Sequence, residues 1–141
     1  MDENLILERF RSHAAGFITM LGGRFVAVDR AAKTCTMEFD ISRDFCHSGD
    51  VVQGGFITAM LDAAMTHAVF AAEDGVVNLS SLEIKTNYLE ATRAGLLRAE
   101  GVVIKSGYKL AFLEGRLYDA QGVLTATSST VAKLIRAKAA S

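Results

Sequence analysis

Hydrophobic side chains occupy nearly every position of residues 51–72, which read VVQGGFITAMLDAAMTHAVFAA. Ala, Met, Leu and Phe dominate this segment, it contains no proline, and its length suits a helix of about five turns. A helix that is apolar on nearly every face is normally buried on nearly every face. The pattern therefore predicts a central core helix, which opens near Gly54-Gly55 and has only four polar interruptions: Thr58, Asp62, Thr66 and His67.

The remaining elements of the predicted core are strands, several of them marked by alternation of apolar and polar residues. The clearest case is residues 34–41, where Cys35, Met37, Phe39 and Ile41 share one face. A strand over residues 24–30 precedes it and forms a hairpin with it. After the central helix, strands are expected over residues 76–89, 96–105, 110–119 and 123–134, joined by short turns that favour antiparallel pairing in a meander.

These elements predict an α+β fold, with one curved antiparallel sheet of five to six strands wrapped around the long apolar helix. The 141 residues form one domain, in which residues 1–23 are a helical segment and residues 24–135 are the core. Residues 42–53 are expected to be a loop that carries polar groups directly before the helix.

Two features of the central helix suggest chemistry. Its first turn leaves backbone N–H groups without partners, and glycines at positions 54 and 55 have no side chains to block the approach of a carbonyl or an oxyanion. Asp62 lies in apolar surroundings, where an ionised carboxylate is costly unless it is paired or functional. Because Asp62 lies about 12 Å along the axis from Gly54, one reacting carbonyl reaches both only if Asp62 comes from a second, antiparallel copy of the helix.

Charge and cysteine content narrow the class of protein. The net charge of −1 gives no electrostatic footprint for nucleic acid or an anionic membrane. Asp62 and His67 argue against a membrane-spanning helix, and the opening MDENLILERF does not have the pattern of a signal peptide. The two cysteines, Cys35 and Cys46, lack metal-ligand spacing and are interpreted as reduced thiols. We therefore expect a cytoplasmic protein with no metal and no nucleic-acid or membrane partner.

The stretch HSGDVVQGGFITAMLDAAM resembles the signature of hotdog-fold acyl-CoA thioesterases of the phenylacetate-pathway (PaaI-like) type. In that signature an Asn or Gln precedes a His-Gly-Gly, and an acidic residue follows eight positions after the first glycine. Gly54, Gly55 and Asp62 match these positions. The late stretches TNYL and SGYKLAFLEGRLYDAQGVLTATSST are similar to the family's later strands, and the resemblance extends over residues 24–134.

The resemblance implies a catalytic role for two residues. The Gly54 N–H would polarise the thioester carbonyl, and Asp62 of the neighbouring subunit would act either as the nucleophile or as the general base that activates water. The substrate would be a coenzyme A thioester, no cofactor would be needed, and the protein would be a homodimer or a homotetramer with its active site at the subunit interface.

The sequence departs from the family pattern at two positions. His47 stands where the family has Asn or Gln, and Gln53 replaces the histidine before the glycines. We expect His47 to help hold the carbonyl or the water, and Gln53 to orient the loop and contact substrate together with Gly55. Ser81 would hydrogen-bond the attacking water.

The Ser106-Gly107 turn and His67 each have a functional and a simpler structural interpretation. The turn at Ser106-Gly107, between Lys105 and Lys109, is a candidate contact for coenzyme A phosphates, although glycine and serine are also ordinary turn residues. His67 does not share the face of Asp62 cleanly at a spacing of five residues, and it is interpreted as a core or interface histidine.

Two other functions are also compatible with the sequence. A hydratase or dehydratase acting on acyl thioesters would pair His47 with Asp62, although the sequence context of such enzymes is missing. A non-catalytic acyl-CoA-binding protein would keep the pocket without turnover. Neither the acyl group nor the choice between dimer and tetramer follows from the sequence.

Overall fold

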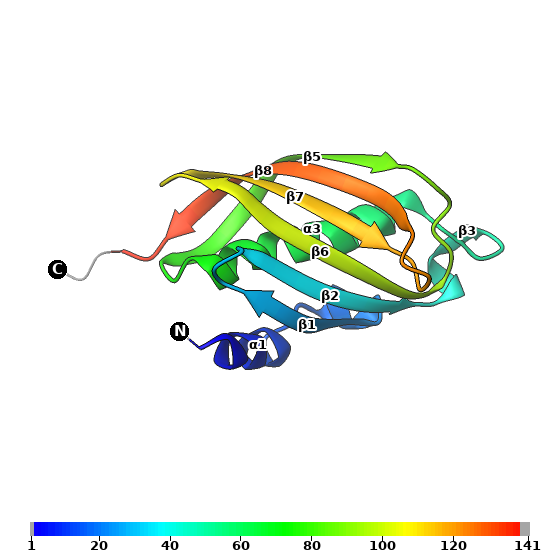
Figure 1. Ribbon diagram of the computed structural model, residues 1–141, viewed down its shortest axis with the longest axis horizontal. Helices are drawn as coiled ribbons and strands as arrows, with labels where there is room; N and C mark the ends of the chain where they lie inside the picture. The colour runs from blue at the N-terminus through cyan, green and yellow to red at the C-terminus, as the bar shows by residue number, and fades with distance from the viewer. Residues whose placement is uncertain (1, 139–141) are drawn as a thin grey trace.

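A computed structural model describes residues 2–138 of the chain. The amino-terminal part forms two short helices and a strand hairpin, and a small second hairpin leads into the long helix (Figure 1). The elements, in chain order, are α1 (Glu3–Ser12), α2 (Gly16–Met20), β1 (Gly23–Asp29), β2 (Thr34–Ile41), the 3-10 turn η1 (Arg43–Phe45), β3 (Cys46–Ser48), β4 (Val51–Val52), α3 (Gly54–Ala72), β5 (Val76–Tyr88), β6 (Gly95–Ser106), β7 (Leu110–Tyr118) and β8 (Leu124–Arg136).

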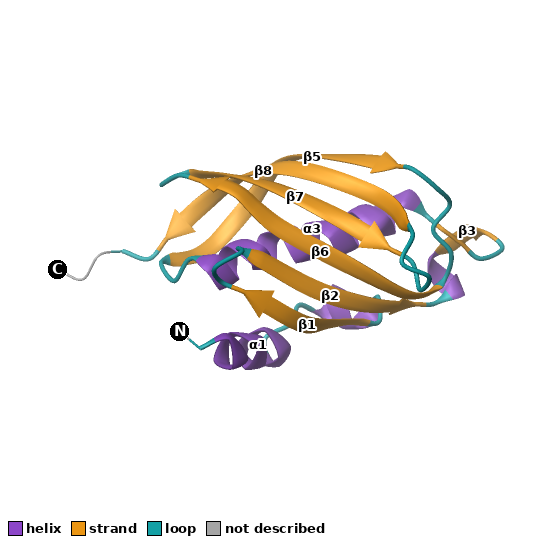
Figure 2. Cartoon of the chain, in the orientation of Figure 1, coloured by secondary structure: helices purple, strands orange, loops and turns teal. Residues whose placement is uncertain are grey.

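The six long strands form one antiparallel sheet in the order β1-β2-β6-β7-β8-β5. The sheet curves over α3, while α1 lies beside β1 (Figure 2). This arrangement confirms the predicted hotdog architecture of a central helix wrapped by a curved sheet. The alternation in residues 34–41 is also confirmed, because Cys35, Met37, Phe39 and Ile41 are each at most 2% exposed.

The prediction of a simple meander after the helix is wrong for β5. This strand pairs with β8 along nearly its whole length, whereas β6 pairs with β2 on one side and β7 on the other. The connection over residues 89–94 therefore carries the chain across the sheet. As a result, β5 is an edge strand, and its outer backbone groups face away from the rest of the sheet.

Two glycines on neighbouring strands allow α3 to pack closely against the sheet. Gly101 of β6 is the register partner of Gly115 of β7. A Cβ atom on Gly101 would lie 2.6 Å from the Met65 nitrogen and closer still to the Ala64 carbonyl oxygen. No side chain fits in that space, so the absence of a Cβ sets the distance between helix and sheet.

The expectation that α3 is buried on nearly every face holds only for the side that contacts the sheet. Met60, Leu61, Ala64 and Met65 are completely buried. The opposite side remains partly open within a single chain, and Asp62 belongs to it. The partly exposed residues on this side recur at helical spacing: Phe56, Ala59, Asp62, Thr66 and Phe70.

Residues 42–53 have more structure than the predicted loop. The segment contains η1 and the paired strands β3 and β4, and Val52 is 2% exposed. Consequently α3 begins at Gly54, after Gln53 as its N-cap. Within residues 2–138, α3 is the one helix long and apolar enough to cross a membrane, but its packing under the sheet identifies it as a core helix.

Candidate active site

Four of the predicted site residues, His47, Gly54, Asp62 and Ser81, line two separate grooves of the chain. The first, here called the amide groove, has a volume of about 490 Å³ and is lined by His47, Gly54 and Tyr88, among others. The second, here called the carboxylate groove, also has a volume of about 490 Å³ and is lined by Asp62 and Ser81. The spacing of eight residues from Gly54 to Asp62 turns the two groups about 80° apart and separates them by about 12 Å along the helix axis.

The start of α3 is fixed by a side-chain cap. Gln53 has an extended backbone, and its Oε1 accepts a hydrogen bond of 2.7 Å from the Gly55 N–H. Among residues 2–138, no group accepts a hydrogen bond from the Gly54 N–H. The first turn therefore presents one unpaired backbone donor beside the amide groove, at the positive end of the helix.

The two glycines do not simply leave space for an incoming molecule, as the sequence suggested. A Cβ on Gly54 would lie 2.9 Å from the Tyr88 hydroxyl, and a Cβ on Gly55 would lie 2.9 Å from Gln53 Oε1. The chain itself therefore fills the space beside both glycines, and each glycine accommodates one specific side chain.

The carboxylate of Asp62 is half-buried, and among residues 2–138 it has one hydrogen-bond donor. Ser81 Oγ on β5 donates to Asp62 Oδ1 at 2.9 Å. Burial raises the pKa of the Asp62 carboxyl above its usual value, while the Ser81 hydrogen bond and the nearby His67 act in the opposite direction. A partly desolvated carboxylate with a raised pKa is a stronger base than an ordinary aspartate.

His67 combines a packing role with a place in the carboxylate groove. Its ring lies among Phe10, Phe25 and Phe70, with centroid distances of 4.9, 4.7 and 5.6 Å. Nδ1 lies 2.8 Å from the Ala63 carbonyl oxygen, which can only accept, so Nδ1 carries a proton. Burial lowers the pKa of this histidine and favours the neutral ring.

These contacts fit the interpretation of His67 as a core histidine. They also show that it borders the same groove as the carboxyl group of Asp62, despite the spacing of five residues.

His47 and the Ser106-Gly107 turn occupy different parts of the molecule. His47 is exposed, and its Nδ1 lies 2.8 Å from Ser48 Oγ at the rim of the amide groove. Ser106 Oγ donates to Glu73 Oε2 at 2.8 Å, and the Gly107 N–H donates to the Leu110 carbonyl. The turn thus uses its own polar groups internally, and its contact with coenzyme A stays a prediction.

Sequence reasoning missed Tyr88 and its two threonine neighbours. The Tyr88 hydroxyl donates to the Gly54 carbonyl at 2.8 Å and lies 3.1 Å from Thr58 Oγ1. Thr58 Oγ1 in turn lies 2.8 Å from Thr86 Oγ1. The available signal was the TNYL stretch, whose alternation places residues 86 and 88 on one face of β5.

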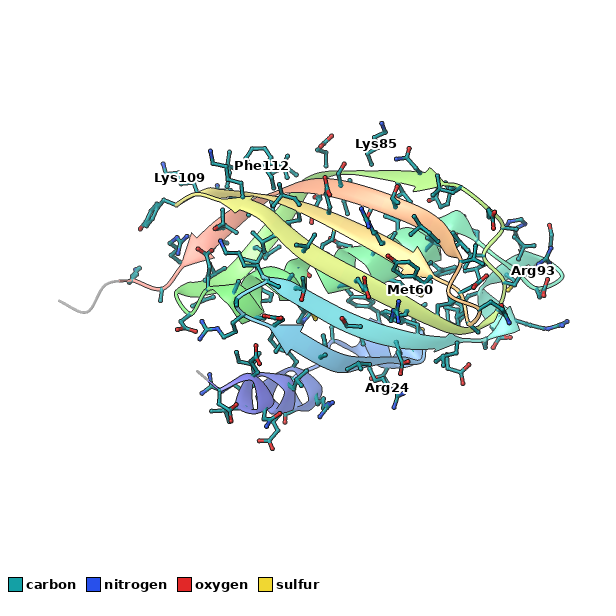
Figure 3. All side chains as sticks on the ribbon, in the orientation of Figure 1. Arg24, Met60, Lys85, Arg93, Lys109 and Phe112 are labelled. Atoms are coloured by element: carbon teal, nitrogen blue, oxygen red, sulfur yellow. The ribbon has the colours of Figure 1, made fainter. Side chains whose placement is uncertain are left out.

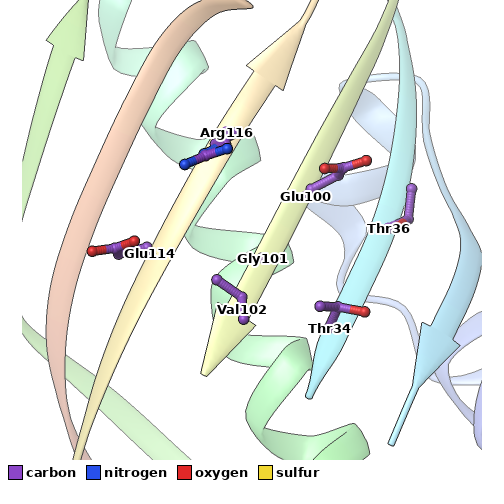
Figure 4. Close-up of a pocket in the computed structure, with 7 residues that line it drawn as sticks. All are labelled: Thr34, Thr36, Glu100, Gly101, Val102, Glu114 and Arg116. Carbon is purple, nitrogen blue, oxygen red and sulfur yellow. The ribbon is translucent and has the colours of Figure 1, made fainter. Parts of the chain in front are cut away.

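A further groove lies on the outer face of the sheet, away from these residues. It has a volume of about 320 Å³, and Figure 4 shows that acidic, basic and hydroxyl side chains line it. Its lining combines Thr34, Thr36, Glu100, Gly101, Val102, Glu114 and Arg116. None of the predicted site residues belongs to this set, so we do not assign it to the active site.

Comparisons with known proteins agree with this architecture. The sequence profile of the thioesterase superfamily matches residues 49–126, which include Gly54, Asp62 and Tyr88. A protein of Saccharolobus solfataricus described as a candidate esterase is 28% identical over 102 residues, 72% of either chain.

Solved structures extend the similarity over most of the chain. A candidate thioesterase of Ralstonia eutropha JMP134, related to phenylacetic acid degradation, is 29% identical with a TM-score of 0.81, over 91% of this chain and 98% of that one. The PaaI protein of E. coli, from the phenylacetic acid degradation operon, has the same TM-score at 15% identity, over 92% and 91% of the two chains. The similarity to the PaaI structure, at this low identity, shows a shared fold.

The family match covers more than half of the chain, and it includes the helix that carries both predicted groups. The chain therefore belongs to the thioesterase superfamily, has the hotdog fold of its PaaI-like members, and is a thioester hydrolase.

Proposed function

We propose that this protein hydrolyses acyl- or aryl-coenzyme A thioesters at two sites, each shared between two antiparallel copies of the chain. The observation that carries the proposal is the division of the polar groups between two grooves. The unpaired Gly54 N–H borders one groove and the Asp62 carboxylate borders the other. Because both sit on one rigid helix, a single carbonyl meets both kinds of group only between two chains.

The surface beside these grooves supports such a pairing. The edge strand β5 carries exposed Val77 and Leu82, which are 59% and 58% accessible. The open side of α3 adds the partly exposed Phe56 and Phe70. An unpaired strand edge next to an apolar helix face is a surface that a second chain can cover. We propose a homodimer as the minimal unit, or a homotetramer made from two such dimers.

In the proposed reaction, the Gly54 N–H donates a hydrogen bond to the thioester carbonyl oxygen and stabilises the negative charge that develops on it. The Asp62 carboxylate of the other subunit then attacks the carbonyl carbon or removes a proton from an attacking water. Attack by the carboxylate expels the coenzyme A thiolate and leaves an anhydride, which water hydrolyses to the free acid. Attack by water gives the acid and the thiol directly.

Other groups assist these two. Ser81 would donate a hydrogen bond to the Asp62 carboxylate. The Ser81 hydroxyl oxygen would still have a lone pair that can accept a proton from the attacking water. His47 would contact the carbonyl or the water from the rim of the amide groove, and the outer edge of the capped Gln53-Gly55 segment would contact substrate. The reaction as proposed needs no cofactor. A cytoplasmic location is part of the proposal, and it fits the two free cysteines, Cys35 and Cys46.

The coenzyme A phosphates would meet the exposed Lys105 and Lys109 beside Ser106 and Gly107. Figure 3 shows Lys109 at one end of the sheet and Arg93 at the other. The backbone of Arg93 forms an antiparallel β-bridge with Val51, close to the start of α3. In an antiparallel pair, the Lys109 end of one chain would approach the Gly54 end of the other. Each site would then have lysines from one chain to bind the nucleotide phosphates and the Gly54 N–H of the other chain to bind the carbonyl.

Thiol release from a panel of aryl- and alkyl-CoA thioesters tests this function. Asp62→Asn should lower kcat by about 10²-fold or more, since a general base contributes 10²–10⁴-fold, while the oligomer persists. A wild-type protein that binds acyl-CoA without releasing thiol would point instead to the binding protein. A changed enoyl chromophore without thiol release would point to the hydratase.

A mixed-subunit experiment tests whether the site is shared. Asp62→Asn and Gly54→Pro chains, each nearly inactive alone, are co-expressed with different tags and the mixed dimer is isolated. One of its two sites would then contain an intact Gly54 and an intact Asp62, so its activity should be about half that of the wild type. A mixed dimer as inactive as its parents would refute the shared site.

A further inference from the structure

We infer that Tyr88 is a positioning residue of the proposed hydrolysis, which together with Gln53 clamps the Gly54–Gly55 peptide and so aims the Gly54 N–H at the substrate carbonyl. The inference rests on the proposed function. Tyr88 lies at the end of β5, 34 residues from Gly54, and its hydroxyl donates to the Gly54 carbonyl at 2.8 Å. Neither the family profile nor the relatives' names assign it a role.

Proton counting gives the hydrogen-bond chain behind Tyr88 one direction. A carbonyl oxygen has no proton to give, so the single hydroxyl proton of Tyr88 is committed to Gly54. Thr58 must then donate to Tyr88 across 3.1 Å, and Thr86 must donate to Thr58 across 2.8 Å. Hydrogen bonds aligned in one direction polarise and strengthen one another. Three hydroxyls thus converge on one carbonyl of the helix start.

The same peptide group is held from its other side by Gln53. The peptide that carries the Gly54 carbonyl also carries the Gly55 N–H, which donates to Gln53 Oε1 at 2.7 Å. Both polar atoms of this peptide are therefore occupied by side chains of the same subunit. The carbonyl hydrogen bond also makes the Gly55 N–H a better donor to its cap, so the two contacts reinforce each other.

The clamp explains why both residues are glycines. Each added Cβ would come within 2.9 Å of a clamping oxygen, that of Tyr88 beside Gly54 and that of Gln53 beside Gly55. With the Gly55 N–H occupied, the neighbouring Gly54 N–H is the donor left for a ligand. Its direction is set by the clamped peptide that follows it, so the orientation is present before substrate binds.

Because Tyr88 acts through Gly54, its removal should affect the transition state more than ground-state binding. We expect Tyr88→Phe to lower kcat about tenfold with KM nearly unchanged, in line with the loss of one hydrogen bond. Thr58→Val should have a smaller effect and Thr86→Val the smallest, because each lies further along the chain of hydroxyls. The matched control is Tyr118→Phe on the outer face of the sheet, where the ring lies 4.9 Å from the Arg98 guanidinium.

A double-mutant cycle separates positioning from general packing. In a Gly54→Pro background the N–H is gone, so Tyr88→Phe should cause no further loss of kcat, whereas in a Gly54→Ala background, which has the same Cβ but keeps the N–H, it should still lower kcat. A wild-type kcat for Tyr88→Phe would overturn the inference. So would an equal tenfold loss in both backgrounds, since the hydroxyl would then act on something other than the Gly54 donor.

Amide hydrogen exchange tests the clamp independently of any thioester. The Gly55 amide should exchange several-fold faster in Tyr88→Phe than in Tyr118→Phe, because its peptide loses one of two anchors. Unchanged exchange would overturn the clamp. Absence of thiol release from the wild-type enzyme would instead refute the proposed function, and the exchange result would still stand.

Discussion

Replacing Gly54 by proline removes the proposed carbonyl-binding donor at a position where the backbone is compatible with proline. The residue occupies the first position of α3, where proline is favoured because its missing N–H has no helical partner. Gln53 before it has φ −67° and ψ 136°, the extended conformation that a residue preceding proline requires. Within residues 2–138 the lost N–H donates to no protein group, so its removal breaks no hydrogen bond of the helix backbone.

The matched control is Gly54→Ala, which introduces the same Cβ but keeps the N–H. In both variants the new atom would lie 2.9 Å from the Tyr88 hydroxyl, which must shift by a few tenths of an ångström. The ratio of the two kcat values therefore isolates the donor. Removal of one oxyanion donor typically costs about 10²–10³-fold in kcat, so we expect Gly54→Pro to be about 10²-fold slower than Gly54→Ala.

The assay follows thiol release at saturating thioester with a chromogenic thiol reagent, and circular dichroism checks that both variants retain their helix content. We expect KM to change little, because the donor acts mainly on the charge that develops in the transition state. Equal kcat values for the two variants would refute the assignment of the Gly54 N–H, whatever the activity of either relative to the wild type.

Three further predictions concern the carboxylate, the helix seat and the nucleotide contact. Burial raises the pKa of Asp62, so the folded state holds the proton of this carboxyl more tightly than the unfolded state does. The stability of the protein therefore falls as the pH rises from the ordinary carboxyl pKa of 3.8 through the raised pKa. Asp62→Asn should thus raise the melting temperature at neutral pH, with the gain vanishing at about pH 3; the same gain at both pH values in thermal melts would contradict this. Gly101→Ala forces a Cβ into the backbone of Ala64 and Met65 and should cost about 1–3 kcal/mol in urea unfolding; Gly16→Ala, which meets no atom within 4 Å, is the control and should leave stability nearly unchanged. The Lys105→Ala, Lys109→Ala double variant should raise KM several-fold for coenzyme A thioesters and leave KM for pantetheine thioesters, which lack the nucleotide phosphates, unchanged; an equal rise for both would exclude a phosphate contact.

The sequence predicted those parts of the fold that depend on local patterns. The alternation of Cys35, Met37 and Phe39 identified β2 and its buried face, because side chains on a strand alternate between two faces. The position of β5 was not predictable in this way. The choice of β8 as the partner of β5 depends on contacts far apart in the chain, which no local pattern shows.

The same distinction applies to the candidate site. Gly54 and Asp62 were predicted because the start of a helix leaves N–H groups unpaired and an apolar helix makes a carboxylate costly. Helix geometry then converts their spacing into a distance, from which the two-chain site is predicted. Gln53 and Tyr88 make contacts with the glycines that only three-dimensional packing reveals. The sequence could suggest that small residues matter at positions 54 and 55, but it could not show that two side chains of the same subunit occupy the space beside them.

The close seat of α3 at Gly101 has a consequence for communication between sites. In the proposed dimer each α3 contributes its amide end to one site and its carboxylate to the other, so a sliding helix would transmit occupancy from site to site. Because Ala64 and Met65 pack directly on the Gly101 backbone, this close contact opposes a sliding movement of the helix. The two sites should therefore act independently, with a hyperbolic dependence of rate on substrate concentration and a Hill coefficient near one.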